Sequence, residues 1–81
     1  MTKFIKAGYR YFNIDYIENI FIEQISFGYV VKFQLKGKDY NIAVFKNIKA
    51  CEDFVIDIFD SSNCDYIDTN YIIGRHLEND K

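Results

Sequence analysis

The segment that decides the fold is an alternating stretch in the middle of the chain, Tyr29-Val30-Val31-Lys32-Phe33-Gln34-Leu35-Lys36. The side chains at positions 29, 31, 33 and 35 are apolar and share one face of a strand. Those at positions 32, 34 and 36 are polar and share the other face. This period of two is typical of an antiparallel sheet that buries one side and leaves the other in water.

Segments on either side of this strand extend it into a meander. Residues 20–26 predict a preceding strand, and Gly37 with Lys38 or Asp39 predicts a tight turn into a following strand at 40–45. In that following strand we expect an inward-facing set of three, Tyr40, Ile42 and Val44. Residues 9–12 predict a first strand, and residues 14–19 predict a single helical turn. The expected sheet is antiparallel and has about four strands.

Beyond position 47, apolar residues no longer recur at every second position but at every third or fourth position. One face of a helix over residues 48–60 then carries six apolar residues, Ile48, Cys51, Phe54, Val55, Ile58 and Phe59. Asn47 is suited to cap the first turn of this helix. Because its apolar face matches the apolar face of the sheet, we expect the helix to pack on the sheet.

The C-terminal segment has a weaker pattern. A short extra strand is compatible with residues 70–73, and residues 75–81 are expected to form a frayed tail. The chain has 81 residues, which is enough for a single core, so residues 1–81 are expected to form a single α+β domain.

Several functional classes are disfavoured by composition. No apolar run approaches the roughly 20 residues that span a bilayer, and charges interrupt the start of the chain, so we expect no membrane association and a cytoplasmic location. The two cysteines, Cys51 and Cys64, are too few for a disulfide framework. We expect Cys51 to be a buried reduced thiol, with a bridge to Cys64 or a metal pair as alternatives.

Candidate catalytic and metal-binding groups are poorly placed. The one histidine, His76, lies in the expected tail, where it could not be held within reach of a substrate proton. The four glycines are scattered, so there is no phosphate-binding loop. Asp57, Asp60, Asp65 and Asp68 offer oxygen ligands but lack the spacing of a calcium loop. We therefore expect no enzymatic activity, no metal site and no cofactor.

Charge is distributed unevenly along the chain. Residues 1–50 contain eight Lys or Arg and four Asp or Glu. Residues 51–81 contain two Lys or Arg and eight Asp or Glu. Like charges three and four apart on one helix face repel, so a helix built only for stability would interleave lysines. The sequence thus suggests an acidic surface that docks on a basic protein partner, made of six residues, Glu52, Asp53, Asp57, Asp60, Asp65 and Asp68. The alternative is that these acids only keep the protein in solution.

A basic surface is the second candidate. Lys32 and Lys36 lie on the outer side of the expected sheet, with Lys38 in the adjacent turn and Phe45 at the end of the last strand. Lysines interleaved with aromatic rings are typical of surfaces that bind nucleic acid. This alternative is less favoured, because the sequence pI is about 5.2. A third alternative is a structural module that dimerises through an uncovered sheet edge.

In size, composition and acidic character the chain resembles small phage-encoded inhibitors of host enzymes, anti-CRISPR proteins among them. Heavy use of Ile, Lys, Asn, Asp, Tyr and Phe, which are read from AT-rich codons, suggests an AT-rich bacterial, phage or plasmid genome. The resemblance is one of type and assigns no role to any residue. It implies a non-enzymatic inhibitor that docks on a nucleic-acid-handling enzyme.

Overall fold

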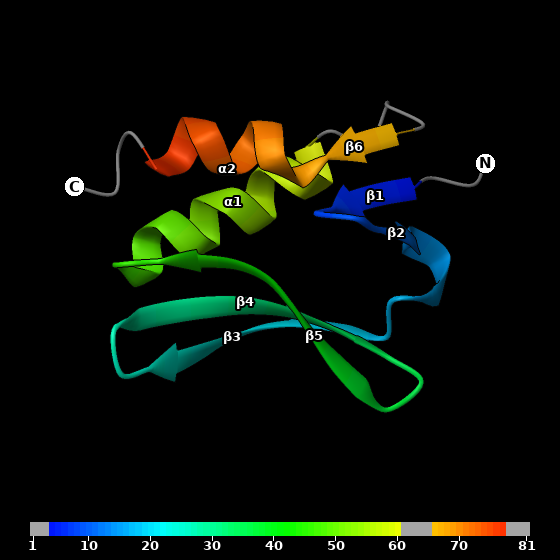
Figure 1. Cartoon of the computed structure of the whole chain (residues 1–81), viewed down its shortest axis with the longest axis horizontal. Helices are drawn as coiled ribbons and strands as arrows, with labels where there is room; N and C mark the ends of the chain where they lie inside the picture. Colours follow the sequence, from blue (N-terminus) through cyan, green and yellow to red (C-terminus); the bar gives the residue numbers. More distant parts are fainter. Residues whose placement is uncertain (1–3, 61–65, 78–81) are drawn as a thin grey trace.

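Over the part of the chain that the structure describes, the fold combines two three-stranded sheets with two α-helices (Figure 1). The computed structural model describes residues 4–60 and 66–77. Within these ranges the elements, in chain order, are β1 (Phe4–Ala7), β2 (Arg10–Asn13), the 3-10 turn η1 (Ile14–Tyr16), β3 (Asn19–Ile25), β4 (Gly28–Leu35), β5 (Lys38–Phe45), α1 (Ile48–Asp60), β6 (Tyr66–Asp68) and α2 (Thr69–Leu77). The predicted α+β class is confirmed.

The larger sheet is the antiparallel meander that the alternating segment predicts, in the order β3-β4-β5. Val31 and Phe33 of β4 are fully buried. The turn between β4 and β5 consists of Lys36 and Gly37, one residue earlier than predicted, with φ of 52° and 78°. A type I′ turn requires positive φ at both central residues, and its twist matches that of the flanking strands.

A bulge in β5 changes which of its side chains face the core. Val31 of β4 lies opposite Ala43, whereas Lys32 lies opposite Asn41, so Ile42 is an extra residue in the ladder. From that point the alternation in β5 is reversed. Ala43 and Phe45 are buried, and Val44 is exposed, so the predicted inward position of Val44 is wrong.

The smaller sheet has the order β2-β1-β6. β1 was not predicted; it pairs antiparallel with β2 and parallel with β6. The C-terminal strand therefore lies at Tyr66–Asp68, and residues 70–73 belong to α2 instead of a strand. Because α2 continues to Leu77, residues 75–77 are helical rather than a frayed tail. Residues 78–81 of the predicted tail lie outside the described residues.

Helix α1 begins where the sequence predicts. The side-chain oxygen of Asn47 accepts a hydrogen bond from the Ala50 amide at 2.9 Å, which confirms the N-cap. Cys51, Phe54 and Ile58 on α1 are fully buried. The side chain of Cys51 is buried, as predicted, and its sulfur lies 3.8 Å from the Tyr29 carbonyl oxygen.

The core lies where the inner faces of both sheets meet α1. Phe12 of β2 packs edge-to-face on Phe33 of β4, with ring centroids 5.6 Å apart. Helix α2 packs against α1 and is joined to β1 by the buried Thr69 hydroxyl, which donates a hydrogen bond to the Lys6 carbonyl oxygen at 2.7 Å. Figure 1 shows α1 between α2 and the meander, with the smaller sheet at one end.

Candidate functional site

Four of the six acidic residues proposed from the sequence have described side chains, and these four lie on two elements, α1 and β6. On α1, Glu52 is exposed, while Asp53 and Asp57 are half-buried. Asp68 is the last residue of β6, and its carboxylate accepts a hydrogen bond from the Asn70 amide at 3.0 Å at the start of α2. The side chain of Asp60 and all of Asp65 lie outside the described residues.

Asp53 is partly neutralised by a lysine one turn earlier. Its carboxylate lies 2.9 Å from the Lys49 ammonium group, at the i,i+4 spacing that favours ion pairs on helices. The hydrogen bond that Lys49 donates to Asp53, and then the negative charge of Asp53, raise the pKa of Lys49 above its ordinary value. Among the acids of α1 whose side chains are described, Glu52 is the one exposed to solvent, so it is the most accessible to a partner.

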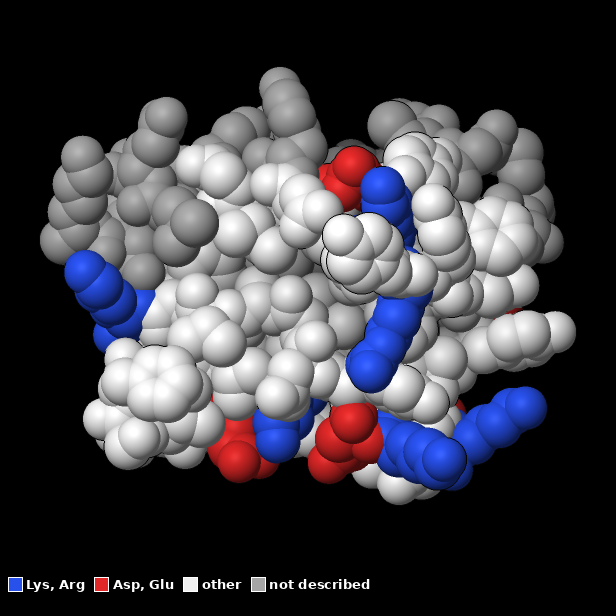
Figure 2. All heavy atoms as spheres, in the orientation of Figure 1, with Lys and Arg blue, Asp and Glu red and all other residues white. Residues whose placement is uncertain are grey.

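On the face shown in Figure 2, acidic and basic side chains are interleaved along the lower edge of the molecule. Glu23 of β3 and Lys32 of β4 form an ion pair, with 3.2 Å between carboxylate oxygen and ammonium nitrogen. This face carries no broad region of a single sign among the described residues. On this face, described side chains of both signs therefore lie near one another.

The residues of the predicted basic and aromatic surface do not all lie on the outer face of the sheet. Phe45 is 1% exposed because the β5 bulge turns it into the core, so its predicted role in stacking bases is wrong. Lys32 is on the outer face, as predicted, but its side chain is only 18% exposed and pairs with Glu23. Lys36 and Lys38 are exposed at the β4–β5 turn.

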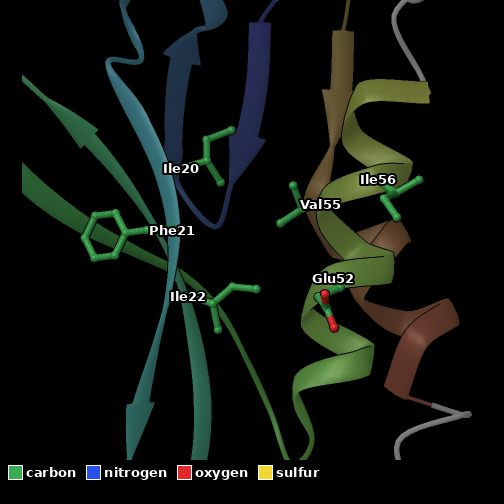
Figure 3. Close-up of a pocket in the computed structure, with 6 residues that line it drawn as sticks. All are labelled: Ile20, Phe21, Ile22, Glu52, Val55 and Ile56. Atoms are coloured by element: carbon green, nitrogen blue, oxygen red, sulfur yellow. The ribbon is translucent and has the colours of Figure 1, made fainter.

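A feature that the sequence did not indicate is an apolar groove between β3 and α1. It has a volume of about 360 Å³ and is lined by Ile20, Phe21, Ile22, Glu52, Val55 and Ile56. Figure 3 shows Ile20 and Ile22 projecting from β3 toward the helix and Val55 projecting back toward them. Phe21 and Ile56 point away from the gap, so they form its outer margins.

The groove continues along the same helix toward the η1 turn. A second hollow shares Ile20 and Val55 with the first and adds Ile14, Ile17 and Phe59. Glu18 lies at this end and Glu52 at the other, so each end of the combined groove carries one carboxylate. Glu18 also accepts a hydrogen bond from the Gly37 amide at 3.2 Å, which holds it near the β4–β5 turn.

Two further observations distinguish this groove from ordinary surface. Ile56 and Phe59 are 54% and 53% exposed, which leaves a wide apolar margin on the solvent side of α1. Strand β3 is an edge strand: among the described residues it pairs with β4 alone. An open edge beside an apolar groove can accept an added strand, with main-chain hydrogen bonds on one side and side-chain pockets on the other.

The comparisons with protein-family models, with curated proteins and with solved structures find no match for this chain. Within residues 4–60 and 66–77, no group of three or more His, Cys, Asp or Glu could hold a metal ion. None of the helices described is long and apolar enough to cross a membrane. The assignment of function therefore depends on the surfaces described above.

Proposed function

We propose that the protein is a non-enzymatic binding protein that docks on a basic protein partner through the groove between β3 and α1. The observation that carries this proposal is the combination of an apolar groove with an open strand edge and a carboxylate at each end. A segment that alternates apolar residues with Lys or Arg is complementary to this surface. It would place its apolar side chains against Ile20, Ile22 and Val55 and its cations near Glu18 and Glu52.

The division of roles follows from the physics of interfaces. Apolar contacts in the groove supply most of the binding free energy, at about 25 cal/mol for each Å² of apolar surface removed from water. Glu18 and Glu52 remain near solvent, so their charges increase the association rate and select basic partners more than they add affinity. A nucleic-acid-handling enzyme is a partner of this kind, because the basic residues that bind phosphates can also bind carboxylates.

A labelled synthetic peptide in which Lys and Leu alternate provides a direct test by fluorescence anisotropy. We expect Ile56→Asp to weaken binding about tenfold or more, because it removes apolar contact area. Glu52→Lys should weaken it about three- to tenfold through the reversed charge. Both positions are exposed, so neither change should unfold the protein.

The matched control is Asp39→Lys, which makes the same charge change at an exposed position of β5 that does not line the groove. This variant should bind the Lys–Leu peptide as the unmodified protein does. A peptide in which Glu and Leu alternate should bind poorly. Equal binding of both peptides, or equal loss in the control and groove variants, would show that the groove is not the site.

A second copy of the chain is the alternative occupant of the open β3 edge. Light scattering distinguishes the two occupants, because a partner-binding groove leaves the isolated protein monomeric. A dimer that Ile56→Asp dissociates would assign the groove to self-association and contradict the proposal.

A further inference from the structure

The outer face of the smaller sheet carries an exposed cluster of aromatic rings. Ile5, Phe12 and Ile67 are buried on the inner face, so alternation places Phe4, Tyr11 and Tyr66 on the outer face. These three side chains are between 43% and 62% exposed. The rings of Tyr11 and Tyr66 have centroids 6.5 Å apart, although β1 separates their strands. We call Phe4, Tyr11 and Tyr66 the aromatic platform.

A hollow of about 510 Å³ lies beside this platform. It is lined by residues of β1, β2, η1 and the β4–β5 hairpin, namely Phe4, Tyr11, Phe12, Asn13, Tyr16, Leu35, Lys36, Lys38 and Tyr40. Two lysines and no carboxylate are among these residues. Figure 1 shows that the smaller sheet and the β4–β5 turn lie at the same end of the molecule, which is how the two lysines come close to the platform.

The lining has the chemistry of a single-stranded nucleic acid site. Exposed tyrosine and phenylalanine rings offer π-faces on which bases stack, and each such contact is worth about five- to 150-fold in affinity. Lys36 and Lys38 can neutralise the phosphates that follow the stacked bases. Tyr16, which is also exposed, lies on the η1 side of the hollow and extends the aromatic surface.

We propose that the aromatic platform and the adjacent hollow bind single-stranded nucleic acid, with bases on Phe4, Tyr11 and Tyr66 and phosphates at Lys36 and Lys38. The lining of this hollow shares no residue with that of the β3–α1 groove, although Glu18 at one end of the groove accepts a hydrogen bond from Gly37, between the two lysines. It also differs from the surface expected from the sequence, since Phe45 is buried and Lys32 is paired with Glu23.

Single strands should be preferred over duplexes. Bases in a duplex are already stacked on one another, so the aromatic platform gains stacking contacts with them only if the strands unpair. Two phosphate contacts predict a shallow salt dependence, with a slope of log K against log salt of about −1.4 for a single strand. The net charge of −2 and the nearby Asp68 keep non-specific attraction of polyanions low.

Tyrosine emission provides the readout, because the chain contains seven Tyr and no Trp. Titration with short oligothymidylate at low salt should quench this emission, whereas the matched duplex should bind at least tenfold more weakly. Tyr11→Ala and Tyr66→Ala should each weaken binding of a labelled oligothymidylate about five- to 150-fold. Lys36→Glu with Lys38→Glu should weaken it and flatten the salt dependence.

Matched controls are available within the chain. Tyr9→Ala removes a fully exposed tyrosine that lines a different hollow, beside Arg10 and Asp39. Lys46→Glu reverses a lysine just beyond the opposite end of β5 from Lys38. Neither should change binding. If a tyrosine variant failed to fold, the variant with both Lys36→Glu and Lys38→Glu would still test the proposal.

The proposal is overturned if oligothymidylate does not bind at low salt. It is equally overturned if the duplex binds as tightly as the single strand, or if Tyr9→Ala weakens binding as much as Tyr11→Ala does. Quenching by the Lys–Leu peptide, with none by oligothymidylate, would assign the platform to a protein partner instead.

Discussion

The ring of Phe45 at the end of β5 packs against the ring of Phe54 in the middle of α1, with centroids 5.6 Å apart and ring planes inclined by 52°. Both side chains are almost completely buried. The contact joins the meander to the helix and places Phe45 in the core instead of on the outer sheet face. It also fixes the position of α1 relative to the sheet, and therefore the position of the groove beside β3.

This contact predicts that Phe45 is a stability residue. Replacing either ring with alanine should lower the free energy of unfolding by about 3–5 kcal/mol, a large part of the total for a domain of this size. A double-mutant cycle with Phe45→Leu and Phe54→Leu should give a coupling of about 0.5–1.5 kcal/mol in urea denaturation. Phe27→Leu in the exposed β3–β4 turn is the control and should change stability by less than about 0.5 kcal/mol. A Phe45→Leu variant with an unchanged free energy of unfolding would contradict this packing.

The β4–β5 turn predicts a stabilising substitution. Lys36 has φ of 52°, a conformation that costs most L-residues free energy but that Asn adopts readily. Lys36→Asn should therefore raise the free energy of unfolding by about 0.5–1 kcal/mol in thermal or urea denaturation. Lys38→Asn, at a strand position, serves as the control and should not stabilise. A loss of stability in Lys36→Asn would exclude the type I′ turn.

Gly28 predicts a severe steric effect. It begins β4 with φ of 151°, and a Cβ at this position would overlap the Phe45 carbonyl oxygen. Gly28→Ala should cost about 2–4 kcal/mol, since it adds backbone strain to a clash with a neighbouring strand. Gly74→Ala is the matched control, because a Cβ there meets no atom within 4 Å and the residue is helical. If both variants had equal stability, the close approach of β4 and β5 at Gly28 would be wrong.

The buried thiol of Cys51 predicts slow chemical modification. Its side chain is inaccessible, so a thiol reagent should reach it only when the protein unfolds. In a Cys64→Ser variant, the one remaining thiol should react slowly in buffer and rapidly in denaturant. Rapid reaction under native conditions would show that the α1–β4 contact around Cys51 opens readily.

Sequence periodicity identified the elements whose patterns are long enough to exclude alternatives. Val31 and Phe33 repeat every second position, and Cys51, Phe54 and Ile58 repeat every third or fourth position. The β5 bulge could not be found in this way, because Ile42, Ala43 and Val44 are all apolar and fit either register. The inward position of Phe45 is a consequence of that bulge.

The smaller sheet was not predicted, because it depends on contacts between segments that are far apart in the sequence. Strand β6 has three residues, and its parallel pairing with β1 joins positions more than sixty residues apart. The aromatic platform follows from that pairing, since it brings Tyr66 beside Phe4. The groove could not be predicted from the pattern of α1 alone. Val55, Ile56 and Phe59 fit an apolar helix face and its flank, whereas the groove is also lined by Ile20 and Ile22 of β3.

The most direct test of the proposed groove is an NMR titration of isoleucine methyl groups with the Lys–Leu peptide. We expect the methyl signals of Ile20, Ile22 and Ile56 to shift with a common dissociation constant. Those of Ile5 and Ile67, which are buried between the smaller sheet and the core, should stay unchanged. Unshifted Ile20 and Ile22 signals at saturating peptide would contradict the central claim that the groove between β3 and α1 binds a basic partner.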